Sequence, residues 1–204
     1  MPSKNWRQDG LLVVVSSPSG GGKTTIVDRL REKHPEYVYS VSVTTRPMRA
    51  GEVNGRHYTF VKPEEFLRLR EGGEFAEWAR VHDHDYGTPR QVIDRTLAEG
   101  RVALFDLDVQ GGLQIKEAYP LSVLVFILPP TFEELERRLR GRGTDPEEVI
   151  RTRLRNARRE VTFWPRYDFV IMNERLHEAV DRVESVIMAE RCRSGRNRID
   201  YGEE

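Results

Sequence analysis

One segment constrains the fold of this chain more than any other: a glycine-rich loop between a strand pattern and a helix pattern. The run from Leu11 to Ser16 is apolar and rich in β-branched residues, the loop spans Ser17 to Thr24, and helical spacing continues from Thr25 to Lys33. Small residues let backbone N–H groups approach phosphate oxygens closely, and the N-terminus of the helix adds its dipole. Strand, loop and helix in this order predict a site for the phosphates of a nucleoside triphosphate.

Two side chains of the loop would carry chemistry. Lys23 would place its charge beside the β and γ phosphates, and the Thr24 hydroxyl would be a ligand of Mg²⁺, a hard cation that prefers oxygen. The general pattern begins with glycine, but Ser17 stands at that position here. A glycine-rich turn without a ligand is the alternative interpretation. The residues expected around the triphosphate are Ser17, Pro18, Ser19, Gly20, Gly21, Gly22, Lys23, Thr24 and Thr25.

A pair of carboxylates follows another apolar run. Asp106 and Asp108 stand at the end of the strand pattern Val102 to Asp106, and ligand sites of parallel sheets form at such strand ends. One carboxylate could hold the metal, directly or through water, and the other could reach an acceptor molecule. The alternative is a capping aspartate in an ordinary turn from strand to helix.

The order of patterns along the chain predicts the fold class. Apolar runs at 11–16, 102–106, 123–128 and 169–172 are each followed by an amphipathic stretch, which indicates an α/β protein with a parallel sheet flanked by helices in three layers. We expect one domain over 9–191, with its core at 9–36 and 96–194. Residues 37–95 would form a small β-rich insertion, two arginine-rich helices within 137–159 would form a lid, and 195–204 would be a frayed tail.

Within these parts, finer boundaries are expected. The insertion contains strand-like runs at 37–44, 57–61 and 75–81 and a helical run at 64–71. Thr131 with Glu134, and Asp145 with Glu148, have the spacing of capping boxes, and Gly100 and Gly141 suit helix ends.

Bulk properties exclude several classes of partner. The 204 residues contain 33 Lys plus Arg and 33 Asp plus Glu, so there is no net charge to attract nucleic acid or an anionic membrane. The apolar runs are too short to span a bilayer, and residues 1–10 show no signal-peptide pattern. The single cysteine, Cys192, excludes an internal disulfide and agrees with a reducing compartment. We expect a cytoplasmic protein without nucleic-acid or membrane partners.

The segment from Ser40 to Tyr58 concentrates hydroxyls, two arginines and a tyrosine, groups that suit a phosphate monoester. It resembles the acceptor site of guanylate kinases, whose pattern of Thr-Thr-Arg, Pro, Arg, Gly-Glu-Val, Gly and Tyr recurs here. The resemblance continues through 74–78, 86–88, 106–111 and 141–144, and covers about residues 9–191. It implies a P-loop nucleoside monophosphate kinase that transfers the γ-phosphoryl group of Mg-ATP to GMP, and also to dGMP. The sequence does not fix the oligomeric state, and we expect a monomer or small homo-oligomer.

The resemblance also implies a role for each matching residue. The phosphate of GMP would be bound by Arg46, Arg49, Tyr58 and Tyr86, and its guanine by Ser42, Glu77, Thr88 and Asp106. Arg138, Arg142 and Arg153 of the lid would cover the transferring phosphates, and Asn173 would lie near the adenine of ATP. Combined with the loop and strand-end chemistry above, the expected holders of Mg²⁺ are Thr24 and Asp108, the latter directly or through water, and the expected catalytic residues are Lys23, Arg46, Arg138, Arg142 and Arg153.

The chemistry of these roles is consistent. Guanine offers an N1–H and a 2-amino donor, which suit carboxylates, and an O6 acceptor, which suits hydroxyls. The phosphate of GMP is largely a dianion at neutral pH, so no general base is required. Two positions besides Ser17 depart from the family pattern: His57 stands where Asp often precedes the tyrosine, and Thr88 stands where Ser is common.

Several alternatives stay open at this point. The lid arginines could be solvated helix residues paired with glutamates, and Tyr58 and Tyr86 could be half-buried aromatics of a sheet. The run from His82 to Asp85 is interpreted as a solvated loop without chemistry. The chain could instead be a P-loop phosphotransferase for another acceptor, or an interaction domain of the kind found in scaffolding proteins, although such domains typically lack a working phosphate loop.

Overall fold

The central element is a parallel sheet of four strands. The computed structural model describes residues 6–49, 51–81, 83–141 and 146–200. The sheet has the order β7-β2-β8-β9, and its strands are β2 (Leu11–Ser16), β7 (Val102–Asp106), β8 (Val123–Leu128) and β9 (Phe169–Met172). All three pairings are parallel. The prediction of a parallel sheet is therefore confirmed, with each strand at its predicted range.

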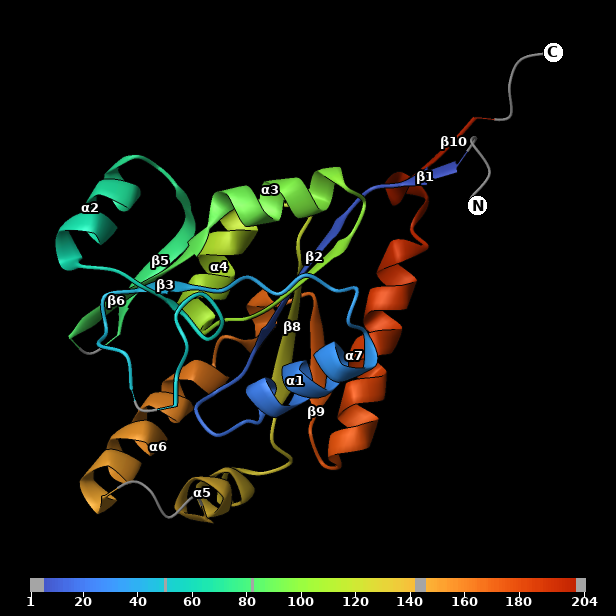
Figure 1. The fold of residues 1–204 in the computed structure, drawn as a ribbon. Helices are drawn as coiled ribbons and strands as arrows, with labels where there is room; N and C mark the ends of the chain where they lie inside the picture. Colours follow the sequence, from blue (N-terminus) through green and yellow to red (C-terminus); the bar gives the residue numbers. More distant parts are fainter. Residues whose placement is uncertain (1–5, 50, 82, 142–145, 201–204) are drawn as a thin grey trace.

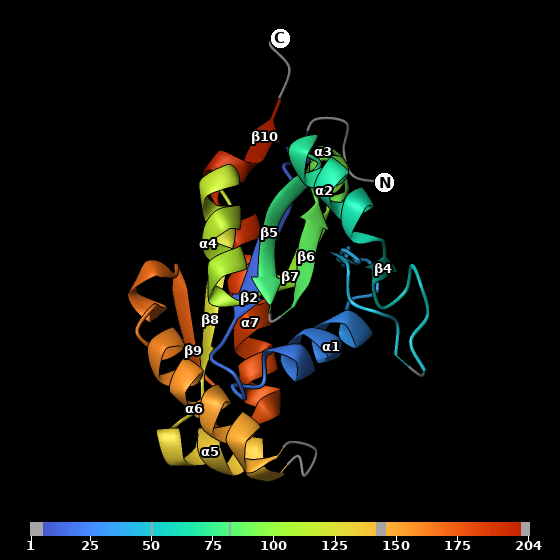
Figure 2. The same cartoon turned by 90° about the vertical axis from the view of Figure 1, so that its left-hand side faces the viewer.

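Helices cover both faces of this sheet. Leu11, Val13 and Val15 of β2 pack in one apolar cluster with α1 (Lys23–Lys33) and α7 (Leu176–Arg191), while Leu12 and Val14 pack in another with α3 (Arg90–Ala98) and α4 (Val109–Ala118). Side chains alternate across a strand, so a strand buried on both faces is apolar at every position. Figures 1 and 2 show the resulting three layers.

The insertion is a second, smaller sheet beside the carboxyl ends of the central strands (Figure 1). Its order is β4-β3-β6-β5, built from β3 (Val43–Thr44), β4 (Thr59–Phe60), β5 (Phe75–Val81) and β6 (His84–Pro89), with α2 (Pro63–Glu71) packed on it. Val43, Phe66 and Phe75 form its small core. The β-rich character of this part is as predicted.

Two boundaries of the insertion differ from the prediction. The strand expected over 37–44 is shorter, because Val38 instead bridges to Ala103 at the edge of the central sheet. Helix α3 starts inside the predicted insertion, yet its Ile93 is fully buried in the second central cluster. The separate sheet therefore extends only to Pro89, the last residue of β6, and α3 belongs to the core.

The two helices predicted within 137–159 are α5 (Phe132–Gly141) and α6 (Glu147–Val161), so they extend beyond the predicted range at both ends. The Thr131 hydroxyl accepts a hydrogen bond from the Glu134 backbone at 3.1 Å, which confirms the capping interaction at the start of α5. Leu135, Leu139 and Ala157 form a separate small cluster between the two helices. Asp145, expected to cap the second helix, lies outside the described residues. Figure 2 shows this pair of helices at one end of the molecule.

The prediction of a frayed tail over 195–204 is wrong for its first part. Residues Ser194–Arg196 form a short 3-10 helix, η2, and β10 (Asn197–Ile199) pairs antiparallel with β1 (Trp6–Gln8). The indole of Trp6 donates to the Asn197 side chain at 2.9 Å. Strands of three residues are too short to show a period in sequence. The ribbon projects from the body in Figure 1.

None of the helices formed by the described residues has the length and apolar character that crossing a membrane requires.

Candidate active site

The backbone of the phosphate loop explains its glycines. Gly20 and Gly22 have φ angles of 90° and 96°, in the left-handed region that favours glycine. A Cβ on Gly21 would lie 2.7 Å from the Cβ of Ser17, and one on Gly22 would lie 2.5 Å from Nδ2 of Asn173. Each of the three glycines is therefore required by the path of the loop or by its packing.

Ser17, the departure from the general pattern, is accommodated within the loop. Its side chain is buried, and its hydroxyl donates to the carbonyl of Pro18 at 3.0 Å. The loop is closed by a bond of 2.8 Å from the Gly21 N–H to the same carbonyl. The buried Ser17 hydroxyl thus has a hydrogen-bond partner within the loop, and this bond is an additional local contact.

Lys23 and Thr24 begin α1 and face Asp106 at the end of the neighbouring strand β7. The Thr24 hydroxyl donates to Oδ2 of Asp106 at 3.0 Å, and Nζ of Lys23 lies 3.7 Å from the same oxygen. Parallel strands present their carboxyl ends at one edge of a sheet, which is why these groups meet. Asp106 is therefore in contact with the phosphate loop, whereas its position in the sequence motif predicted a contact with guanine.

Asp108 has the surroundings that were expected of Asp106. It is the N-cap of α4, where its Oδ1 accepts from the Gly111 N–H at 2.8 Å. A Cβ on Gly111 would lie 3.0 Å from Oε2 of Glu77 and 3.4 Å from Oδ1 of Asp108, so the two carboxylates approach the same point. The two aspartates thus have different surroundings: Asp106 lies against the loop, whereas Asp108 lies near Glu77 and also lines the cleft beside the loop.

Glu77 and Thr88 form a buried pair on neighbouring strands of the insertion. Glu77 is 6% exposed and Thr88 is 1% exposed, and the Thr88 hydroxyl donates to Oε1 of Glu77 at 2.6 Å. Burial raises the pKa of Glu77 to about 7, against the opposing effect of the Thr88 hydrogen bond. Ser42 is half-buried just before β3, and its carbonyl accepts from Thr59.

Arg46 is held in place by a carboxylate that was assigned no role from sequence. Its guanidinium makes a two-fold contact with Glu52, at 2.6 and 3.0 Å, and it is 8% exposed. The hydrogen bond from Arg46, followed by one from the Arg49 N–H, lowers the pKa of Glu52 to about 2. The guanidinium also lies 5.4 Å from the ring centre of Tyr58, and Tyr58 meets Tyr86 edge-on at 5.9 Å.

Two described arginines of the lid lie close to the phosphate loop: Arg153 contacts the loop itself, and Arg138 contacts Asn173 beside it. Nε of Arg153 donates to the Ser19 hydroxyl at 3.0 Å. Arg138 is paired with Glu134 and also donates to the backbone carbonyl of Asn173 at 2.8 Å. One interpretation of the sequence was that glutamates pair with these arginines. Such a pair is present at Arg138, although it engages only part of the guanidinium. Arg142 lies outside the described residues.

Asn173 supports the loop from behind. Its side chain is 5% exposed and donates to the carbonyl of Gly21 at 3.0 Å. It follows β9 directly, so the end of the outermost central strand is tied to the glycine run. The hydrogen bond provides a structural role for Asn173, in addition to the expected proximity to adenine.

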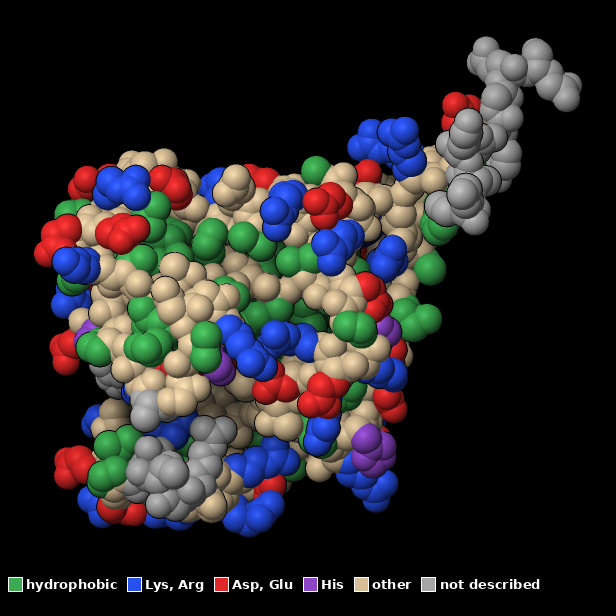
Figure 3. All heavy atoms as spheres, in the orientation of Figure 1, with side chains coloured by type: hydrophobic (Ala, Val, Ile, Leu, Met, Phe, Trp, Pro, Cys, Tyr) green, Lys and Arg blue, Asp and Glu red, His purple; other side chains and the backbone are tan. Residues whose placement is uncertain are grey.

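A cleft lies between the loop and α6. Its lining includes residues 17–20 and 22–25 of the loop on one side and Thr152, Arg153, Asn156 and Glu160 of α6 on the other. The backbone N–H of Ser19 donates to Glu160 at 2.8 Å across this cleft, and desolvation raises the pKa of Glu160. Figure 3 shows the surface hollowed between the lid helices and the rest of the molecule.

Sequence reasoning missed three residues of this site: Tyr39, Glu52 and Glu160. Glu52 falls inside the Gly-Glu-Val motif, so its position could have been flagged by the motif alone. Tyr39 and Glu160 meet the site through contacts between distant segments, the former with Asp106 and the latter with Ser19. No local pattern marks them.

Known proteins resemble this chain over most of its length. Residues 9–190 match the family model described as guanylate kinase. The guanylate kinase of Caldanaerobacter subterraneus is 44% identical over 96% of this chain and 95% of that protein, and the guanylate kinase of Rhizobium etli is 50% identical over 92% of this chain and 86% of that protein. A crystal structure of guanylate kinase from Anaplasma phagocytophilum superposes with a TM-score of 0.78 at 37% identity, covering 94% of this chain and 92% of that chain.

Proposed function

The chain belongs to the guanylate kinase family, and from this premise we propose that it transfers the γ-phosphoryl group of Mg-ATP to GMP, giving ADP and GDP. One observation carries the proposal beyond the family likeness. The phosphate loop with Lys23 stands at the carboxyl edge of the central sheet, and the buried Glu77–Thr88 pair stands on the insertion beside it. Asp106 and Asp108, two positions apart, link the donor side to the acceptor side.

Recognition of guanine would rest on Glu77, Thr88, Asp108 and Ser42. The carboxylates of Glu77 and Asp108 accept only, which matches the N1–H and the 2-amino group of guanine. The Thr88 proton is engaged with Glu77, so Thr88 orients that carboxylate, and the Ser42 hydroxyl is the better donor to O6. Adenine would leave these groups unpaired, at a cost of about 1–3 kcal/mol for each buried partner.

The phosphate of GMP would be bound by Arg46, Arg49, Tyr58 and Tyr86. Glu52 already holds the Arg46 guanidinium in one orientation, which reduces the ordering cost when a phosphate arrives. Arg49 is exposed, so its side chain can turn toward a bound anion. The two hydroxyls of the edge-on tyrosine pair complete a donor set suited to a phosphate monoester.

The residues around Asp106 fit a magnesium ion. The Thr24 hydroxyl and Asp106 Oδ2 are two oxygens 3.0 Å apart beside the loop, and oxygen is the donor that Mg²⁺ prefers. Thr24 and Asp106 would hold the ion, directly or through water, in place of the Asp108 expected from sequence. When bound, Mg²⁺ supplies positive charge to the β and γ phosphates of ATP.

The remaining chemistry belongs to the chain itself. Lys23 neutralises charge that develops on the β and γ phosphates, while the loop N–H groups and the α1 dipole hold their oxygens. Arg138 and Arg153 approach from the lid, and Arg142 would join them by the family pattern. The GMP oxygen attacks as a dianion, so the residues need only align the two nucleotides and exclude water.

A panel of nucleoside monophosphates with Mg-ATP tests the proposal. GMP should be phosphorylated fastest, with dGMP as the expected second substrate, because Glu77, Thr88 and Asp108 address the base and not the sugar. Phosphorylation of AMP or UMP at the rate of GMP would contradict the guanine assignments. A cytoplasmic location and the oligomeric state stay predictions.

A further inference from the structure

Tyr39 contacts the carboxylate that faces the donor nucleotide. Its hydroxyl donates to Oδ1 of Asp106 at 2.6 Å, while Oδ2 of the same carboxylate accepts from Thr24. The final torsion of an aspartate side chain is broad and poorly defined by itself. Because each oxygen of Asp106 has its own donor, the plane of the carboxylate is fixed, with one oxygen turned to the phosphate loop.

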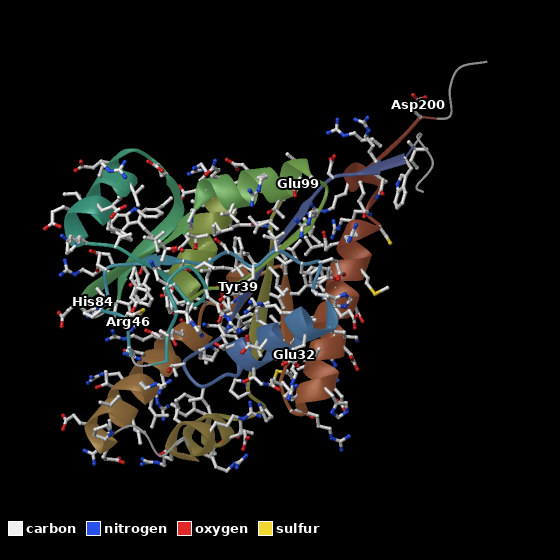
Figure 4. All side chains as sticks on the ribbon, in the orientation of Figure 1. Glu32, Tyr39, Arg46, His84, Glu99 and Asp200 are labelled. Carbon is white, nitrogen blue, oxygen red and sulfur yellow. The ribbon has the colours of Figure 1, made fainter. Side chains whose placement is uncertain are left out.

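The phenol that provides this contact is itself held from three sides. The guanidinium of Arg31 lies 4.1 Å from the centre of its ring, and the ring packs against the apolar cluster beneath α1. The preceding residue, Val38, exchanges backbone hydrogen bonds of 2.8 and 2.9 Å with Val102 and Leu104 of β7. Tyr39 is thereby fixed to the strand that ends in Asp106, and Figure 4 shows it above α1, between the core and the insertion.

We propose that Tyr39 is a positioning residue for the metal–nucleotide complex: its hydroxyl holds Asp106 so that Oδ2 faces Thr24 and the divalent ion. This inference rests on the proposed ATP-dependent function. Loss of the hydroxyl leaves Oδ1 without this donor and lets the carboxylate turn. Partners that orient a ligand without touching the metal typically change metal affinity by about tenfold or more when they are removed.

The test compares Tyr39→Phe with Tyr37→Phe. Both rings pack on the same apolar cluster, but Tyr37 stacks on the His34 ring at 4.5 Å and does not belong to the Asp106 contact. The probe is Mn²⁺, which also takes oxygen ligands, titrated into the complex of the protein with ADP and followed by electron paramagnetic resonance of the free ion. A parallel titration measures ADP binding in EDTA.

Tyr39→Phe should weaken Mn²⁺ binding by about tenfold and leave the affinity for metal-free ADP unchanged, while Tyr37→Phe should change neither. In an Asp106→Asn background the effect of Tyr39→Phe should largely disappear, because the oriented group is gone. An unchanged Mn²⁺ affinity in Tyr39→Phe, an equal loss of metal-free ADP binding, or full additivity with Asp106→Asn would overturn the inference.

Phosphorylation of GMP by the unmodified protein separates this inference from the function on which it rests. An unmodified protein that does not phosphorylate GMP contradicts the proposed function. An active protein whose Mn²⁺ affinity is indifferent to the Tyr39 hydroxyl contradicts only the positioning role.

Discussion

Replacement of Glu77 by Gln should make this protein more stable and a poorer GMP kinase. The carboxyl is 6% exposed, and burial raises its pKa from the ordinary 4.5 to about 7. A raised pKa means that the folded state resists the charged form that GMP requires. Gln keeps the size of the side chain and an oxygen that can accept from Thr88, but it never carries the charge.

The size of the effect follows from the pKa. Each pKa unit corresponds to about 1.4 kcal/mol, so the ionised carboxylate lowers the free energy of unfolding by about 3 kcal/mol. Between pH 4.5 and pH 7 the folded state binds more protons than the unfolded state. The contribution of Glu77 to the free energy of unfolding is therefore fully present below the pKa of its carboxyl in the unfolded state. It is lost as the pH rises through the pKa of the carboxyl in the folded state.

Urea unfolding at two pH values measures this difference. The free energy of unfolding of Glu77→Gln should be higher than that of the unmodified protein by about 3 kcal/mol at pH 8. At pH 5, where Glu77 is protonated in the folded state, the difference should be less than about 1 kcal/mol. Glu65→Gln, at an exposed position of α2, is the matched control and should differ by no more than about 0.5 kcal/mol at either pH.

Glu77→Gln should impair the reaction with GMP, although it stabilises the fold. An amide presents a donor where guanine also presents donors, so KM for GMP should rise by about tenfold or more in the variant. In the unmodified protein, KM for GMP should rise as the pH falls below 7, because protonated Glu77 is no longer an acceptor-only group. The reasoning is refuted if Glu77→Gln destabilises the fold at pH 8, or if its advantage is the same at both pH values.

Three further predictions concern the donor side. Lys23→Ala should lower kcat by about a hundredfold or more, since charge on the transferring group is no longer neutralised, while GMP still binds with unchanged Kd in a fluorescence titration; unchanged turnover would be incompatible with the donor assignment. Removal of divalent ions with EDTA should stop phosphoryl transfer in a coupled assay and leave GMP binding intact, because the acceptor residues are separate from Thr24 and Asp106. Gly22→Ala should lower the free energy of unfolding by about 1–3 kcal/mol, because φ is 96° and the new Cβ would meet Asn173 at 2.5 Å. The control is Gly141→Ala, whose Cβ would meet nothing within 4 Å. Equal urea midpoints for the two variants would contradict the predicted strain at Gly22.

The central sheet could be predicted from sequence because its signal is local. The run at 123–128 contains only apolar residues, and five of its six residues are buried. A strand buried on both faces has this composition whatever its neighbours are. The glycine run of the phosphate loop is also marked locally, by its φ angles at Gly20 and Gly22 and by the contact of Gly21 with Ser17, although Gly22 also packs against the distant Asn173.

The assignment of the two aspartates could not be made in the same way. Which carboxylate faces the loop depends on where strand β7 ends and helix α4 begins. The strand ends at Asp106, and Asp108 already caps the helix, so two positions in sequence separate two different environments. Contacts such as Tyr39 with Asp106, or Glu160 with Ser19, depend on how distant segments meet. No pattern of residues in the sequence indicates these contacts.

The ribbon of β1 and β10 has a consequence for how the chain acquires its structure. The Trp6–Asn197 contact joins residues 191 positions apart, so the segment around Trp6 leaves the ribosome long before its partner is made. During synthesis it must remain unpaired while the sheet and helices between them assemble. The entropic cost of bringing the two segments together falls once the folded body has placed their neighbours close to each other. The environment of the Trp6 indole would therefore report the final event of folding, separately from the assembly of the nucleotide site.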